Sequence, residues 1–116
     1  MREILNELNS EAGLVGSMVI TPDGIMVAAA LGPKFEEDTV AAFASALLLG
    51  LKRSLSLFHC RGEPTSCMLK ATGGRITFFD MKNSYLVLVT DSSKKLDGSA
   101  EVIQSAIHKI KNRRVA

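Results

Sequence analysis

A chain of 116 residues with 47% hydrophobic and 22% charged residues has the composition of a soluble, globular protein, which excludes an intrinsically disordered chain. This length predicts a single domain, residues 1–116, that buries a core without disulfides or metals. The net charge of +2 is too small to suggest nucleic-acid binding, which usually needs a clustered basic face. Aromatic residues make up only 5%, so small and aliphatic side chains must fill the core.

The chain begins with a pattern that predicts a helix and then a β-hairpin. Apolar residues at helical spacing, ending at Gly13, predict a helix over residues 2–12. Two apolar runs, residues 14–21 and 25–31, predict two strands. Between them, Pro22 fixes φ at the first corner of a turn and Gly24 accepts a positive φ at its exit.

A long second helix is predicted from about Glu36 to Phe58, with acidic residues in its first turn. One broad apolar face is expected to pack on the sheet, and it comprises Val40, Phe43, Ala44, Leu47, Leu51, Leu55 and Phe58. A stripe of small residues at four-residue spacing comprises Ala42, Ala46, Gly50 and Ser54. Small residues allow another helix to approach closely, so we expect this stripe at a homodimer interface; the alternative is packing within the same chain.

Three strands and a last helix complete the expected order α-β-β-α-β-β-β-α. The strands are predicted over residues 65–72, 75–81 and 85–90, with turns at Gly73-Gly74 and at Lys82–Ser84. The third run is almost continuously apolar, which indicates a central strand covered on both faces. The inner face of the last helix is expected to contain Ala100, Ile103, Ala106, Ile107 and Ile110.

No combination of residues suits catalysis or metal binding. The glycines match neither a phosphate loop nor a dinucleotide fingerprint. His59, Cys60 and Cys67 supply at most three neighbouring ligands, fewer than a structural zinc site needs, and both cysteines are expected to be reduced thiols. We therefore expect no enzymatic activity, no catalytic residues, no metal and no cofactor.

No segment suggests export, membrane insertion or nucleic-acid binding. The N-terminus lacks the apolar centre of a signal peptide, and the longest apolar stretch, Val40–Leu51, is too short to span a bilayer. The basic run Lys109–Arg114 is interpreted as a solvated last helical turn. The expected location is cytoplasmic.

Four features follow one another in a particular order and spacing: Leu5 and Leu8, the segment Gly13–Ile20, Asp23-Gly24, and the run Tyr85–Asp91. In this order they resemble the Roadblock family, which is related to dynein light chains and to bacterial regulators of small GTPases, and the resemblance covers essentially the whole chain. One departure is Leu96-Asp97-Gly98, which has one residue more than the Leu-Gly step common in the family.

The resemblance implies an α+β fold and a way of dimerising. A five-stranded antiparallel sheet would have the two terminal helices on one face and the long central helix on the other. Family members dimerise by placing the central helices side by side and joining edge strands, here residues 65–72. The residues expected at this interface are Ala42, Ala46, Leu49, Gly50, Ser54, Cys67, Met68 and Leu69.

The function that the resemblance implies is regulation of a Ras-like small GTPase by a non-enzymatic homodimer. The expected partner-binding residues are Leu49, Lys52, Arg53 and Ser56. Arg53 or Arg75 could also reach outward to a GTPase as a catalytic arginine in trans. The alternatives are a dynein-type or trafficking scaffold whose partners are indifferent to nucleotide, and a small-molecule sensor module.

Overall fold

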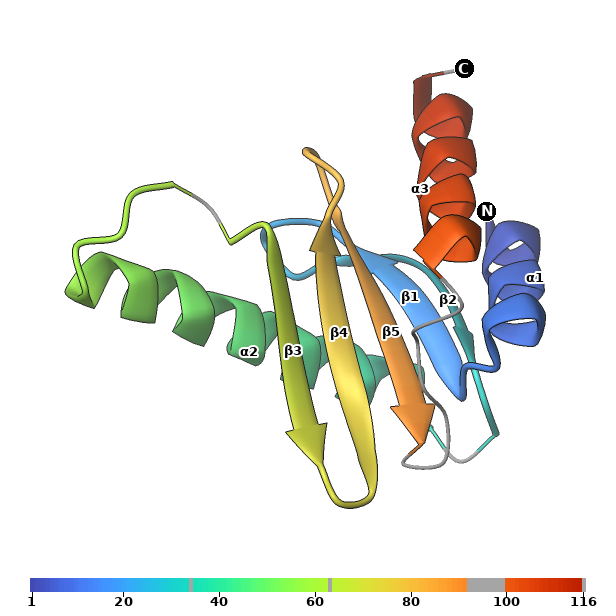
Figure 1. Cartoon of the computed structure of the whole chain (residues 1–116), viewed down its shortest axis with the longest axis horizontal. Helices are drawn as coiled ribbons and strands as arrows, with labels where there is room; N and C mark the ends of the chain where they lie inside the picture. The colour runs from blue at the N-terminus through green and yellow to red at the C-terminus, as the bar shows by residue number, and fades with distance from the viewer. Residues whose placement is uncertain (34, 63, 92–99, 116) are drawn as a thin grey trace.

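The computed structural model describes residues 1–33, 35–62, 64–91 and 100–115, and Figure 1 shows its three helices and five strands. The elements in chain order are α1 (Arg2–Ala12), β1 (Gly16–Ile20), β2 (Met26–Leu31), α2 (Glu37–Leu57), β3 (Ser66–Ala71), β4 (Gly74–Asp80), β5 (Tyr85–Asp91) and α3 (Ala100–Val115). The predicted order of elements is confirmed. The predicted departure at Leu96–Gly98 lies outside the described residues.

The five strands form one sheet in the order β2-β1-β5-β4-β3, and every neighbouring pair is antiparallel. Strand β5 is central, between β1 and β4, as its apolar sequence predicts. Alternate side chains of a strand point to opposite faces of the sheet, and most of those of β5 are buried on both faces. Strands β2 and β3 are the two edges.

Each face of the sheet carries its own apolar core, as expected from the family resemblance. Helices α1 and α3 pack on one face, where Val19, Leu86 and Leu88 point toward them. Helix α2 packs on the opposite face, where Met18, Phe78 and Val87 meet its Ala44 and Leu48. Figure 1 shows α2 crossing behind β3 and β4, with α1 and α3 side by side at the right of the view.

The β1–β2 turn forms as predicted and packs against α2. The Thr21 N–H donates to the Ile25 carbonyl over 2.8 Å, and the Gly24 N–H donates to the Thr21 carbonyl over 2.9 Å. Gly24 has a φ of +88°. A Cβ atom built at Gly24 would overlap Oγ of Ser45 in α2, so the close packing as well as the positive φ requires a residue without a side chain.

The structure corrects three details of the sequence interpretation. The β3–β4 turn consists of Thr72 and Gly73, because Gly74 already belongs to β4, pairing with Ala71 and with Asp91. Ala100 is exposed, although the other apolar residues expected on the inner face of α3 are buried.

The third correction concerns the inner face of α2. Phe43 and Phe58 are exposed rather than packed on the sheet, and Leu48, which the pattern does not assign, is fully buried. The part of the helix surface that reaches the sheet is narrower than the apolar surface of the helix, so most of the apolar surface stays outside the core.

Replacing Gly24 by alanine is predicted to destabilise the fold, by about 2 kcal/mol, because the methyl group meets Ser45 and the positive φ is strained for alanine. Gly73→Ala is the matched control, since a Cβ there meets nothing within 4 Å. Denaturant unfolding at one fixed protein concentration measures both variants. Equal transition midpoints would contradict the assigned turn packing.

Candidate protein-interaction surface

The two edges of the sheet differ in how they are covered. At the β2 edge, α1 places two side chains on strand carbonyls: Arg2 Nε donates to the Ala29 carbonyl over 3.0 Å, and Asn9 Nδ2 donates to the Ala30 carbonyl over 2.8 Å. Arg2 also forms an ion pair with Glu37 at the start of α2. Because neighbouring residues of a strand direct their carbonyls to opposite sides, one of these two carbonyls faces away from the sheet, so α1 covers part of this edge.

The β3 edge is open in the described part of the chain. Its residues are mostly exposed, including Met68 at 54% and Leu69 at 40%. Exposed apolar residues on an unpaired edge strand favour pairing with another strand. Cys67, the third interface residue predicted on this strand, is half-buried and contacts the α2-side core.

The hydrogen-bond pattern of the β3–β4 hairpin identifies which groups of β3 face outward. The Asp80 N–H donates to the Thr65 carbonyl over 2.9 Å, so these two residues form a hydrogen-bonded pair. Because such pairs alternate along an antiparallel ladder, Cys67, Leu69 and Ala71 direct their backbone groups toward β4. Ser66, Met68 and Lys70 therefore direct theirs away from the sheet.

Helix α2 presents a second exposed apolar surface. It is the one helix of the described chain long and apolar enough by composition to cross a membrane, with a mean hydropathy of 1.4 over 18 residues, yet only 11% of that window is buried. The helix would span about 31 Å, whereas a five-stranded sheet is about 20 Å wide. Figure 1 accordingly shows the C-terminal part of α2 extending past β3.

The extending part of α2 ends in two large apolar side chains, Leu57 at 72% and Phe58 at 79% exposure. The sequence interpretation did not place either residue at an interface. A comparison of the predicted helix length with the width of the predicted sheet would have shown that the helix leaves at least one end uncovered, whereas which end is uncovered depends on how the helix is placed over the sheet.

The predicted dimer residues of α2 all lie on its surface. They are Ala42, Ala46, Leu49, Gly50 and Ser54, and each is exposed. A Cβ atom built at Gly50 would meet nothing within 4 Å. The small-residue stripe is therefore accessible and does not pack on the rest of the described chain, which argues against the alternative considered for it.

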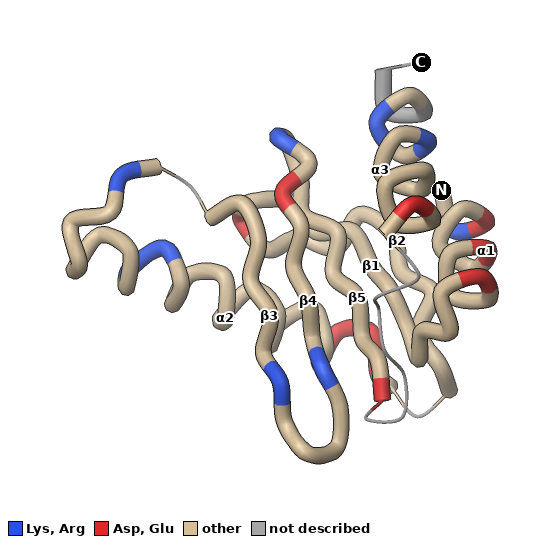
Figure 2. Tube along the Cα trace, in the orientation of Figure 1, with Lys and Arg blue, Asp and Glu red and all other residues tan. Residues whose placement is uncertain are grey.

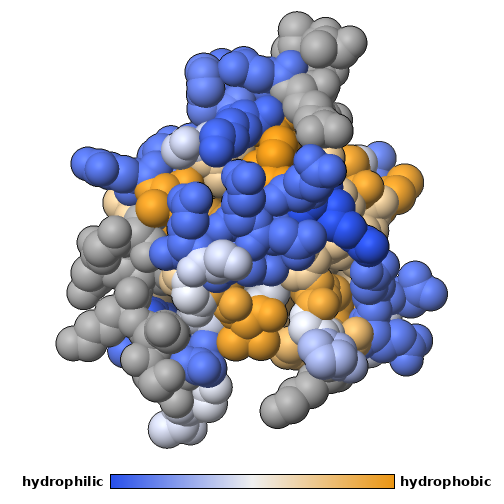
Figure 3. Space-filling model, turned by 90° about the vertical axis from the view of Figure 1, so that its right-hand side faces the viewer, coloured by the Kyte–Doolittle hydropathy of each residue, from blue (hydrophilic) through white to orange (hydrophobic). Residues whose placement is uncertain are grey.

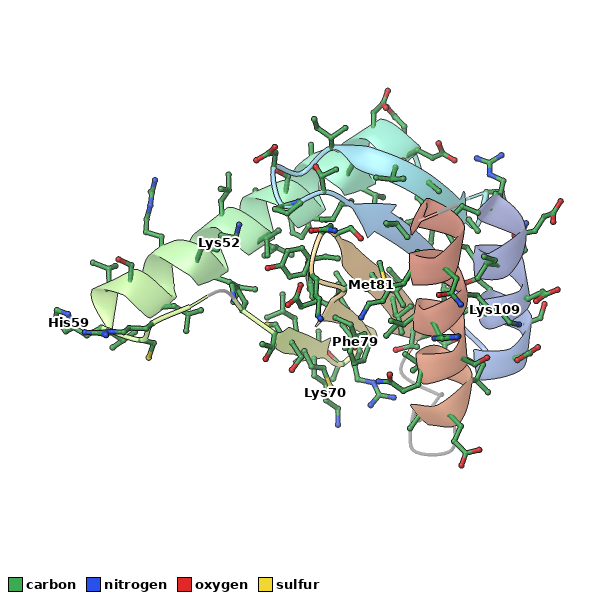
Figure 4. The ribbon with its side chains drawn as sticks, turned by 90° about the horizontal axis from the view of Figure 1, so that it is seen from above. Lys52, His59, Lys70, Phe79, Met81 and Lys109 are labelled. Carbon is green, nitrogen blue, oxygen red and sulfur yellow. The ribbon has the colours of Figure 1, made fainter. Side chains whose placement is uncertain are left out.

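The predicted partner-binding residues form one ridge of α2, because positions 49, 52, 53 and 56 follow helical spacing. Leu49, Arg53 and Ser56 are exposed, and Lys52 is half-buried. The helix has acidic residues in its first turn, and Figure 2 shows its basic residues on the extending part. Figure 4 labels Lys52 there and His59 just beyond the helix.

The two candidate arginines lie on different sides of the sheet. Arg53 belongs to the exposed ridge of α2. Arg75 pairs with Lys70 and Thr90 in the sheet, and its neighbour Ile76 points to the α2 side, so Arg75 points to the side of α1 and α3. A partner docked on α2 would thus meet Arg53 but not Arg75.

Two hollows contain side chains that could bind a small molecule. An apolar cavity of about 300 Å³ lies between the β3 edge and α3, and its lining comprises Ser66, Cys67, Met68, Thr77, Phe79, Ala100, Ile103 and Gln104. A shallow polar hollow at the end of α2 is lined by Lys52, Ser56, His59, Cys60, Arg61 and Gly62. Neither contains a carboxylate.

Among the described residues, no three histidine, cysteine or acidic side chains lie close enough together to hold a metal ion. His59 and Cys60 are both exposed, and Cys60 and Cys67 are not bonded to each other. The residues that the structure brings together are instead apolar and cationic, on α2 and at the β3 edge.

The opposite side of the molecule is different in character. Figure 3 faces α1 and α3 and shows a mostly hydrophilic surface, with apolar atoms in smaller patches between polar ones. The exposed ion pair between Lys109 and Glu7, 3.7 Å apart, links these two helices. The surface best suited to protein contacts therefore combines β3 with the outer side of α2.

Comparisons with known proteins agree with this fold. The chain is 30% identical over 108 residues to an uncharacterized protein of Methanocaldococcus jannaschii, covering 93% of this chain and 94% of the relative. The structure is similar to Myxococcus xanthus MglB, with a TM-score of 0.82, 12% identity and coverage of 96% of this chain and 91% of that one. It is also similar to an MglB structure described as having a tetrameric arrangement, with a TM-score of 0.75, 17% identity and coverage of 90% and 80%.

The family model described as the Roadblock/LC7 domain matches residues 1–90. This match includes both sheet edges, the whole of α2 and all but the last residue of the central strand β5. The chain therefore belongs to the Roadblock/LC7 domain family.

Proposed function

We propose that this protein is a cytoplasmic, non-enzymatic homodimer that binds a Ras-like small GTPase and regulates its GTP hydrolysis or its location. The observation that carries the proposal is the exposure of α2, an apolar helix of which only a small part packs on the chain's own sheet. Membership in the Roadblock/LC7 family and the similarity to MglB structures support this proposal.

A second copy of the chain fits both exposed surfaces at once. A β3 strand can pair with the β3 of another copy across a two-fold axis, which gives an isologous contact and continues the sheet. The continued sheet would then lie beneath the part of α2 that extends past β3. Leu57 and Phe58, which are exposed in the single chain, would then have an apolar surface to pack on.

The small-residue stripe of α2 suits the approach of the second helix. Ala42, Ala46 and Gly50 have little or no side chain, so two α2 helices can lie closely side by side. A membrane-spanning role for α2 is less suitable, because Ala44 and Leu48 already pack on the sheet and Lys52 and Arg53 interrupt the helix.

The ridge of Leu49, Lys52, Arg53 and Ser56 would remain beside this helix pair and would face a third protein. Its mixture of an apolar residue and two cations suits a partner surface with apolar and acidic residues. Regulation would then occur by repositioning the GTPase's own switch residues. Arg53 is the residue of this ridge that could reach toward the nucleotide.

Pairing at β3 is tested by Met68→Pro. The Met68 N–H faces away from the sheet, so proline is tolerated in the single chain but cannot donate a hydrogen bond to a second strand. We expect a folded monomer by circular dichroism and light scattering, whereas Lys70→Ser, which changes only a side chain, stays dimeric. A dimeric Met68→Pro variant would show that the copies associate elsewhere.

The GTPase surface is tested with purified Ras-like GTPases of the source organism, loaded with GDP or with a non-hydrolysable GTP analogue. Wild-type protein is expected to bind one GTPase at least tenfold more tightly in the analogue-bound form, measured by calorimetry. Equal affinity for both forms would favour the nucleotide-indifferent scaffold, and no binding would contradict the proposal.

Charge reversal by Lys52→Glu and Arg53→Glu is expected to weaken this binding at least tenfold at low salt, with the dimer intact. The matched control is Lys82→Glu with Lys111→Glu, which makes the same change of charge away from α2, at the β4–β5 turn and on α3. Equal loss in both double variants would indicate a general effect of net charge rather than a docking site on α2.

A further inference from the structure

We propose that two copies pair their β3 strands in one particular register, in which Met68 lies directly opposite Met68 of the partner subunit. The inference rests on the homodimer proposed above and specifies its contact residue by residue. It depends on which backbone groups of β3 face outward and on what each register would place opposite them.

A two-fold pair of β3 strands can be centred on Cys67, Met68 or Leu69, since residues on either side of the centre then oppose each other symmetrically. The outward-facing residues of each strand are Ser66, Met68 and Lys70. Centring on Met68 places Ser66 opposite the partner's Lys70. Every outward N–H and C=O of the two strands then has a partner.

The other two centres leave backbone groups unpaired. Centring on Leu69 places Ser66 opposite the partner's Thr72, which lies in the β3–β4 turn rather than in the strand. Centring on Cys67 places Lys70 opposite the partner's Pro64, which has no N–H to donate. A strand hydrogen bond left unmade costs about 1 kcal/mol or more, so the Met68 centre is favoured.

Side chains favour the same register. Ser66, Met68 and Lys70 share the face of the sheet toward α3, so centring on Met68 gives an apolar pair flanked by Ser66 and Lys70. Centring on Leu69 would instead set each Lys70 opposite a methionine and bring the two ammonium groups to neighbouring diagonal positions. Like charges at such positions are destabilising.

On the other face, the favoured register sets Cys67 opposite the partner's Leu69. These residues form a non-hydrogen-bonded pair across the new ladder, where the Cα atoms lie about 4.5 Å apart. That distance is within the range that a disulfide bridges. A cysteine introduced at position 69 should therefore cross-link to the native Cys67 of the other copy.

The experiment uses the full chain with Cys60→Ser as background, so that the exposed thiol outside β3 cannot react. The test variant adds Leu69→Cys, and a second variant adds both Leu69→Cys and Cys67→Ser. After mild oxidation, non-reducing electrophoresis and mass spectrometry measure the covalent dimer. We expect most of the test variant to be cross-linked, and little of the background protein or of the second variant.

Each other pattern overturns the register. Cross-linking of the background protein alone would place Cys67 opposite the partner's Cys67, and cross-linking of the second variant would centre the pair on position 69. A molar mass measured by light scattering under reducing conditions separates the two proposals. A dimer that forms no cross-link in any variant contradicts the register, whereas a monomeric wild-type protein contradicts the homodimer itself.

Discussion

Helix α2 is longer than the sheet it crosses is wide, and this mismatch determines what a single chain can bury. The sheet has an apolar face for only the part of the helix that lies over it, where Ala44 and Leu48 are buried. Beyond β3 the helix has no sheet beneath it, and its sequence there combines Lys52 and Arg53 with apolar residues that continue to Phe58. Phe43 and Leu49 are also exposed, but the two most exposed large apolar side chains, Leu57 and Phe58, lie at this end of the helix, beside one edge of the sheet.

The rest of the fold keeps that edge distinct from the other one. Helix α1 lies against β2, and its Arg2 and Asn9 donate to the carbonyls of Ala29 and Ala30, so part of this edge is covered within the chain. The β3–β4 hairpin has no such cover in the described residues, and its backbone groups at Ser66, Met68 and Lys70 point away from the sheet. One edge of the sheet is thus partly covered by α1, and the uncovered edge is the one beside the exposed end of α2.

Most of the fold could be predicted from the sequence because the signals that determine it are local. The turn at Thr21–Gly24, the left-handed Gly13 at the end of α1 and the apolar run of β5 each act within a few residues. The packing of α2 could not be predicted in the same way. Apolar periodicity shows which side of a helix is hydrophobic, but not how much of that side finds a neighbour in the same chain. For this reason Phe43 was wrongly expected in the core, and Leu48 was not expected there.

The sequence predicted two parts of the candidate surface, the small-residue stripe of α2 and the β3 edge, but not its continuation to Leu57 and Phe58. Small residues at four-residue spacing and an apolar edge strand are visible in the sequence, and the structure leaves both exposed. Leu57 and Phe58 depend on the position of the helix end relative to the sheet edge, which is a property of three dimensions. Their exposure comes from geometry rather than from any local pattern.

The open edge of β3 presents backbone N–H and C=O groups, which are the same in almost every strand. Backbone pairing alone therefore distinguishes poorly between different partner strands. An organism that makes several proteins of this family would therefore face a problem of sorting, since each could add its edge to any other. Discrimination would have to come from the side chains of the strand itself, above all those of Met68 and Lys70. Divergence among related copies at these positions would decide whether a cell assembles separate homodimers or a set of mixed pairs.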